Sequence, residues 1–220
     1  MIAVRAEKVP EGSILLDTDT PVTDAALDAA WEYGATGIIR YVGFGKTRGP
    51  LDISPAERDL IVTPKRSRRF GLLLVQHVRF DPWMPSEEMG HDDGEAALIH
   101  LAEVEYAPGS TFWDDLEGIA EGDTSEPTVD YANAKCQMIL GGGFEQGEYI
   151  GDRVPLASAA LYHELLADLY WKSASEVPDV LVRSYCMVQG SGVTLAGIRF
   201  DRNKMTGDRL GGRPTWTVAA

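Results

Sequence analysis

The sequence predicts an α/β protein built as a (β/α)8 barrel of the TIM type, in which some helices are shortened or missing. Apolar segments of strand length alternate with amphipathic segments of helix length along the chain, and this alternation is typical of parallel strands joined by right-handed crossovers. The strand segments number about eight, as a closed barrel requires. Acidic residues follow several of them, where barrel active sites form. A doubly wound open sheet is the alternative, because alternation alone does not reveal closure.

The first half of the chain has helices marked by clear end signals. Thr23 is an expected N-cap, and Gly34 ends the helix that follows it. The segment Ser54-Pro55-Ala56-Glu57 combines an N-cap, a proline at the first helical position and the Glu of a capping box. The predicted strands here are 13–17, 37–42 and 70–76, the last continuously apolar as in a strand buried on both faces.

The second half continues the alternation, with connections that shorten toward the end. Ala97, Leu101 and Val104 form the apolar stripe of one helix, and three glycines from Gly141 stop another. The predicted helices are 92–106, 128–140 and 159–169, and the predicted strands are 111–117, 144–150, 169–171, 182–189 and 196–201.

Composition indicates one globular domain over residues 1–220. Apolar residues make up 44% and charged residues 25% of the chain, and no linker divides it. The formal net charge of −14 argues against a nucleic-acid partner, because binding a polyanion requires a basic surface. The basic run 65–69 is expected to complement the negative end of the preceding helix. Composition leaves the oligomeric state open.

Neither a membrane span nor a secretion signal is predicted. No run of eighteen apolar residues occurs, and residues 1–10 lack the apolar core of a signal peptide. Localisation is therefore not fixed, and an extracellular or phage-associated protein would be expected to use another export route.

The sequence predicts no cofactor and no metal site. The four histidines form no i,i+4 pair and have no cysteine partner suited to zinc. Cys136 and Cys186 lie in apolar segments far apart, so free buried thiols are expected. Gly190-Ser191-Gly192 lacks the strand–Ser–helix setting of a nucleophile elbow.

Asp115 and Glu117 end the predicted strand 111–117 two residues apart. Side chains at i and i+2 of a strand share a face, so the two carboxyls are expected to lie close together. Two such acids cannot both ionise freely and can divide acid and base roles, as in glycosidic bond cleavage. The alternative is an acidic, solvated turn.

Polar and aromatic residues follow the other predicted strands and would meet at the same rim. Asp19 has the alternative role of capping the turn at Thr20-Pro21, and core packing is the alternative for each tryptophan. The candidate rim residues are Asp17, Asp19, Gln76, His77, Asp115, Glu117, Tyr149, Trp171, Gln189, Asp201 and Asn203, with Trp113 or Trp83 as stacking faces for a sugar.

The motifs at these strand ends resemble a known group. Residues 16–23 (LDTDTPVT), 112–117 (FWDDLE), 147–149 (GEY) and 200–203 (FDRN), with Trp171 and Gln189, are similar to the glycoside hydrolase-like TIM-barrel domain of actinobacterial envelope and phage proteins, a relative of the family-25 lysozymes. The resemblance implies that Glu117 is the general acid and Asp115 its partner carboxylate. It implies that Asp17 and Asp201 are rim acids that position and polarise the site.

The predicted function is hydrolysis of a β-glycosidic bond in a bacterial cell-wall glycan of the peptidoglycan type. A second hypothesis is a barrel that binds envelope polysaccharide or builds a phage virion without catalysis. A third is an enzyme of the same fold that acts on a small intracellular metabolite.

Overall fold

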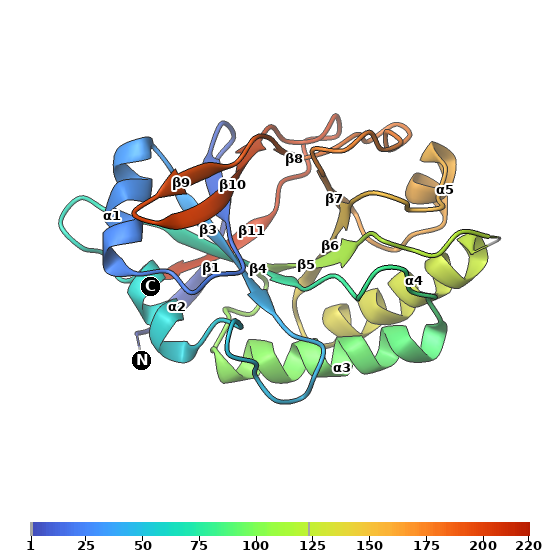
Figure 1. Ribbon diagram of the computed structural model, residues 1–220, viewed down its shortest axis with the longest axis horizontal. Coiled ribbons are helices and arrows are strands. Elements are labelled where there is room, and N and C mark those ends of the chain that lie inside the picture. Colours follow the sequence, from blue (N-terminus) through green and yellow to red (C-terminus); the bar gives the residue numbers. More distant parts are fainter. Residues whose placement is uncertain (1, 123) are drawn as a thin grey trace.

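The computed structural model describes residues 2–122 and 124–220, and its centre is a closed eight-stranded barrel with helices outside it (Figure 1). The predicted α/β barrel is therefore confirmed. The elements are β1 (Val4–Lys8), β2 (Ile14–Asp17), α1 (Asp24–Tyr33), β3 (Gly37–Val42), α2 (Pro55–Val62), β4 (Gly71–Gln76), α3 (Glu87–Glu103), β5 (Thr111–Leu116), α4 (Ser125–Gly141), β6 (Glu145–Ile150), α5 (Ser158–His163), β7 (Leu169–Lys172), β8 (Met187–Gln189), β9 (Val193–Leu195), β10 (Ile198–Met205) and β11 (Thr215–Ala219).

The barrel runs β2-β3-β4-β5-β6-β7-β8-β10 and closes between β10 and β2. Its first seven strands are parallel, but β10 is antiparallel to both β8 and β2. The expectation of eight parallel strands is wrong at this point. A parallel crossover needs a dozen or more residues, whereas Gln189 and Ile198 are too close in the chain for one, and the β9–β10 hairpin reverses its direction.

Helices cover the barrel unevenly, as predicted. In the described residues α1 to α4 each connect two parallel strands, α5 is a short helix of six residues, and no helix follows β7 or β8. Helices α3 and α4 lie against each other on one side of the barrel (Figure 1). Several predicted boundaries move. Helix α3 begins at Glu87 behind the N-cap Ser86, and α5 ends at His163. Strand β8 begins only at Met187, and β10 continues to Met205.

Strands β1 and β11 are absent from the predicted elements. They pair antiparallel with each other, and β11 continues onto β4 through Thr217 and Leu72. Trp216 of β11 joins the core inside the barrel, where it covers Gly71 so closely that a methyl group there would lie 2.0 Å from the indole. The β1–β11 pair thus packs against the end of the barrel at which the parallel strands begin.

Alternate side chains of each barrel strand point inward. Leu73 and Val75 of β4 belong to the core inside the barrel, whereas Leu72 and Leu74 belong to the core between barrel and helices. This alternation decides which residues at the strand ends reach the interior.

The capping residues form the predicted helix ends, but some charged side chains have other partners. Ser54 accepts from the backbone N–H of Glu57, as expected. The Glu57 carboxylate does not return to Ser54; it binds Arg40, with Nε and Oε1 2.7 Å apart, and both side chains are buried. In the basic run, Lys65 and Arg68 bind acids of α1 instead of the end of α2.

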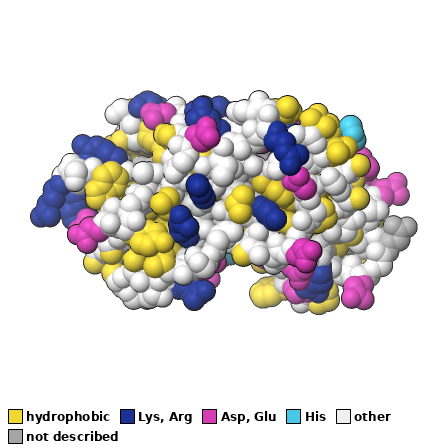
Figure 2. All heavy atoms as spheres, turned by 90° about the horizontal axis from the view of Figure 1, so that it is seen from above, with side chains coloured by type: hydrophobic (Ala, Val, Ile, Leu, Met, Phe, Trp, Pro, Cys, Tyr) yellow, Lys and Arg dark blue, Asp and Glu magenta, His cyan; other side chains and the backbone are white. Residues whose placement is uncertain are grey.

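The molecular surface carries both charge signs. On the face in Figure 2, Lys and Arg side chains are distributed among acidic and apolar ones. Cys136 and Cys186 are free and buried, which confirms the prediction of unpaired thiols. Among the described residues, no helix has the length and apolar character that a bilayer crossing requires.

Candidate functional site

The candidate site is a cavity of about 360 Å³ at the end of the barrel where the parallel strands finish. A smaller cavity of about 170 Å³ adjoins it and shares four of its lining residues, Tyr41, Asp115, Glu117 and Asp201. The larger cavity is lined by Asp17, Thr18, Asp19, Thr20, Tyr41, His77, Val78, Asp115, Glu117, Arg199 and Asp201.

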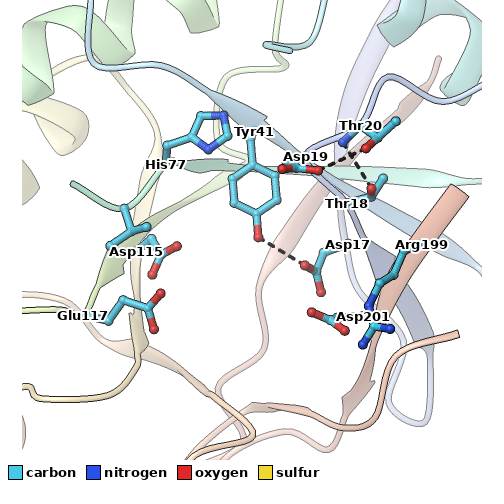
Figure 3. A pocket seen from close by; sticks show the side chains of 11 residues that line it. Asp17, Thr18, Asp19, Thr20, Tyr41, His77, Asp115, Glu117, Arg199 and Asp201 are labelled. Carbon is cyan, nitrogen blue, oxygen red and sulfur yellow. Dashed lines mark hydrogen bonds between the residues drawn. The ribbon is translucent and has the colours of Figure 1, made fainter. Parts of the chain in front are cut away.

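Asp115 and Glu117 occupy one wall of this cavity. Trp113 lies in the barrel interior one inward position below Asp115, and Glu117 follows directly after β5. Asp114, with the opposite orientation, binds Lys135 of α4 outside the barrel. The alternation of β5 therefore brings the two candidate acids to the same cavity, where they face Asp17 and Asp201 (Figure 3).

Asp17 and Asp201 lie on paired strands and form the opposite wall. They are direct partners in the register of β2 and β10. The Asn203 amide donates to Asp17, with Nδ2 and Oδ2 2.5 Å apart, and the Tyr41 hydroxyl donates to the other oxygen over 3.1 Å. Asn203 in turn accepts from the Trp171 indole N–H over 2.9 Å. These bonds fix the Asp17 carboxyl against the cavity.

The carboxyls of Asp115 and Glu117 are held toward their protonated forms. Burial raises the pKa of Asp115 well above its usual range, and the neighbouring charge of Glu117 raises it further. Burial also raises the pKa of Glu117, against the effect of a backbone hydrogen bond at Asp152. Asp115 and Glu117 are thus a couple that retains a proton more readily than two solvated acids would.

Asp17 shows the same effect. Burial raises its pKa to about 7, and the charge of Asp201 adds to the rise, while the hydrogen bond from Asn203 opposes it. Its ordinary value is 3.8. Asp17 therefore titrates near neutrality in the folded protein.

This shift predicts that Asp17→Asn changes how stability depends on pH. A folded-state pKa above the unfolded value contributes stability that is present below about pH 4 and is lost as pH rises toward 7. The variant lacks this loss. Its free energy of unfolding should therefore rise relative to that of the wild type between pH 4 and pH 7. Chemical denaturation of both proteins at pH 4, 5.5, 7 and 8 measures the difference. A difference that stays constant over this range would contradict the assignment.

Several other predicted residues lie where the rim was expected. Asp19 and His77 line the larger cavity, and Tyr149, Trp171 and Gln189 line the smaller one. The Tyr149 hydroxyl donates to Gln189 over 3.0 Å. Asn203 lies behind Asp17 as described, outside the lining of either cavity. The imidazole of His77 stacks on the ring of Tyr41, and burial lowers the pKa of His77, which favours the neutral ring.

Three candidate contacts with a sugar lie elsewhere. Gln76 points outward and donates to backbone carbonyls of Gly43 and Asp93. Trp113 is fully buried against Trp171, so its faces are closed to a ligand. Trp83 packs on Tyr131 and donates to the backbone carbonyl of Glu117 over 2.7 Å. These residues support the site from behind instead of contacting a substrate.

Sequence reasoning missed Tyr41 and Arg199. Tyr41 shares the inward face of Ile39 in β3, and this alternation was the available signal. Arg199 lies two residues before Asp201 on β10, so it shares the face of Asp201.

Another cavity, of about 340 Å³, lies where β6 and β7 begin, at the opposite end of the barrel. Four of its charged side chains form two ion pairs, Lys8 with Glu145 and Arg183 with Asp168. Within residues 2–122 and 124–220, no group of three or more His, Cys, Asp or Glu side chains could hold a metal ion.

Solved structures share this fold over most of the chain. A Tat-secreted protein of Mycobacterium tuberculosis, Rv2525c, is 14% identical over 90% of this chain and 98% of its own, with a TM-score of 0.63. A family 25 glycosyl hydrolase from Bacillus anthracis is 11% identical over 91% of each chain, with a TM-score of 0.52. The chain has the fold of the family 25 glycosyl hydrolases.

The modular autolysin LytC from Streptococcus pneumoniae, solved with a synthetic peptidoglycan ligand, has the same barrel. It is 14% identical over 87% of this chain and 46% of its own, with a TM-score of 0.58. No protein-family model and no curated protein matches the sequence. The fold predicted from the strand-end motifs is thus confirmed by structures of low sequence identity.

Proposed function

We propose that this protein hydrolyses a β-glycosidic bond in a bacterial cell-wall glycan of the peptidoglycan type. The observation that carries the proposal is the position of Asp115 and Glu117, which line one cavity together with Asp17 and Asp201. Glycoside hydrolysis needs two carboxyl groups beside the scissile bond, one of them protonated at working pH. Burial raises the pKa of both members of the couple, and the charge of Glu117 raises that of Asp115 further, so the couple is suited to supply that proton.

Glu117 is the acid in this proposal. It borders both cavities and a further one of about 190 Å³ that includes Gly118 and Arg153, so its side chain is accessible from several directions. Asp115 is set deeper, with one buried oxygen, Oδ1, that has no hydrogen-bond partner.

In the reaction, Glu117 transfers its proton to the glycosidic oxygen while the bond from that oxygen to the anomeric carbon breaks. The bonding electrons pass to the departing oxygen, and positive charge develops on the sugar ring. The negative charge left on the Asp115–Glu117 couple stabilises this ring, with Asp17 and Asp201 on the other side. Water then adds to the anomeric carbon and returns a proton to Glu117.

The comparisons support this choice of substrate. LytC is an autolysin solved with a synthetic peptidoglycan ligand, and the Bacillus anthracis protein is a family 25 glycosyl hydrolase. Both have the barrel on which the present carboxyls converge. At the identities observed, these relatives support the proposal through their fold.

Product analysis tests the proposal. Purified protein is incubated with cell-wall glycan strands and with chitin oligomers, and new reducing ends are measured and identified by mass spectrometry. The proposal expects new reducing ends from the cell-wall glycan. Binding of the glycan without new ends would favour the second hypothesis, a polysaccharide-binding or virion-associated barrel without catalysis.

A further inference from the structure

Arg199 is a cation at the mouth of an acidic cavity. It lies on the inward face of β10, beyond Asp201, and its side chain stands beside the Asp201 carboxylate in Figure 3. Among the described residues that line this cavity, it is the only Lys or Arg. The other basic group is the His77 imidazole, and burial lowers its pKa.

The guanidinium of Arg199 has no partner in the described structure. Several other arginines of the chain bind acids: Arg40 binds Glu57, and Arg79 binds Asp93. Arg199 makes no such ion pair, even with Asp201 next to it. Its hydrogen-bond donors therefore remain open toward the cavity.

The backbone that carries Arg199 is held firmly. Its neighbours Ile198 and Phe200 are buried in the core that also contains residues of α1, and strand β9 pairs with them in the hairpin. Gly192 lies against this pair of charged side chains. A methyl group there would lie 2.7 Å from Asp201 Oδ1 and 2.9 Å from Arg199 Nη2, so the glycine leaves the space that both side chains occupy.

We propose that Arg199 binds a carboxylate carried by the glycan and thereby selects acidic glycans over neutral ones. This inference rests on the function proposed above and names the substrate class of the same site. A guanidinium presents a planar fork of donors that matches a carboxylate with two parallel hydrogen bonds. A neutral sugar would leave this fork solvated. Two kinds of glycan carry such a carboxylate, those with a lactyl ether on the ring and those with a uronic acid, and the probes below distinguish them.

The acids of the cavity do not prevent such binding. Burial raises the pKa of Asp115 and Asp17, so these two walls carry less negative charge near neutrality than solvated acids would. In this proposal the anionic substituent lies at the rim, where Arg199 is exposed. The sugar ring then lies between this substituent and the Asp115–Glu117 couple.

Binding to three disaccharides tests the proposal. The probes are N-acetylglucosaminyl-N-acetylmuramic acid, a glucuronic acid–N-acetylglucosamine disaccharide and neutral chitobiose, titrated at pH 7 by calorimetry into a Glu117→Gln protein, which prevents turnover. At least one acidic probe should bind about tenfold more tightly than chitobiose, because a charge-assisted bidentate contact is added. The acidic probe that binds identifies the source of the carboxylate.

The same titrations on Arg199 variants complete the test. Adding Arg199→Gln should remove about a tenfold advantage for the acidic probe and leave chitobiose unchanged, and Arg199→Lys should restore part of it. Arg202→Gln, on the other face of β10, is the matched control and should keep the preference. Equal affinities for acidic and neutral probes, an unchanged preference in Arg199→Gln, or no binding by any probe would overturn the proposal. Reducing ends released by the wild type test the proposed function separately. Cleavage without a preference for acidic glycans would contradict the role of Arg199 and leave the proposed hydrolysis standing.

Discussion

Replacing Glu117 with Gln should reduce glycan cleavage by roughly 10²- to 10⁴-fold, the usual contribution of a general acid. Gln has nearly the same shape but cannot deliver a proton to the leaving oxygen. The side chain is only partly buried and forms no ion pair in the described structure, so the melting temperature should be retained. Initial rates of reducing-end release and a thermal melt measure the two quantities.

Glu121→Gln is the matched control for this experiment. Glu121 is an exposed acid four residues further along the same loop, outside the described linings of the cavities that Glu117 borders. This variant should cleave at the wild-type rate. Equal rates for wild type and Glu117→Gln would refute the role of Glu117, and a lower melting temperature in Glu117→Gln would make the lost activity a folding effect.

Lys135→Met should lower the free energy of unfolding by about 3–5 kcal/mol at pH 7, the usual cost of breaking a buried ion pair. Lys135 and Asp114 are both buried, and the ammonium group of Lys135 contacts Asp114 Oδ1. Glu148, also buried, lies near this pair, and burial together with the charge of Asp114 raises its pKa, so it does not replace Asp114 as the partner of Lys135. Without Lys135, Asp114 must either stay ionised in a medium of low polarity or take up a proton. Denaturant unfolding monitored by fluorescence measures the loss.

Two further variants separate the ion pair from simple loss of a lysine. Lys46→Met removes an exposed lysine that pairs with Glu95, and it should cost at most about 1 kcal/mol. The double variant Asp114→Asn, Lys135→Met should be more stable than Lys135→Met alone, because no buried charge is left without a partner. If Lys135→Met proved as mild as Lys46→Met, the pair would not be a stabilising contact of the barrel wall.

Local patterns were sufficient to predict the barrel and the strands that carry the acids. Apolar runs such as 70–76 have the length of buried strands, and Asp17 and Asp115 stand at strand ends. Parallel strands bring such ends to one rim, so convergence follows from topology alone. The direction of β10 was missed because hydrophobic pattern does not encode strand direction. The short connection from Gln189 was the usable signal.

The orientation of single side chains was harder to predict. A strand buried on both faces has no polar alternation that tells inward from outward positions. Gln76 was therefore placed in the site, although it shares its face with Leu74 and points toward the helices. Trp113 was read as a sugar-stacking face, but its position below Asp115 makes it part of the barrel core. Whether such a side chain points inward can be decided only when the pairing of strands distant in sequence is known, as for Asp17 and Asp201.

The most direct test of the central claim is a crystal structure of Glu117→Gln soaked with a peptidoglycan tetrasaccharide. We expect a glycosidic oxygen within hydrogen-bond distance of the residue 117 side chain, with one sugar ring between Asp115 and the Asp17–Asp201 pair. A glycan bound at the opposite end of the barrel, or lying over the rim with its glycosidic oxygens out of reach of residue 117, would contradict the account.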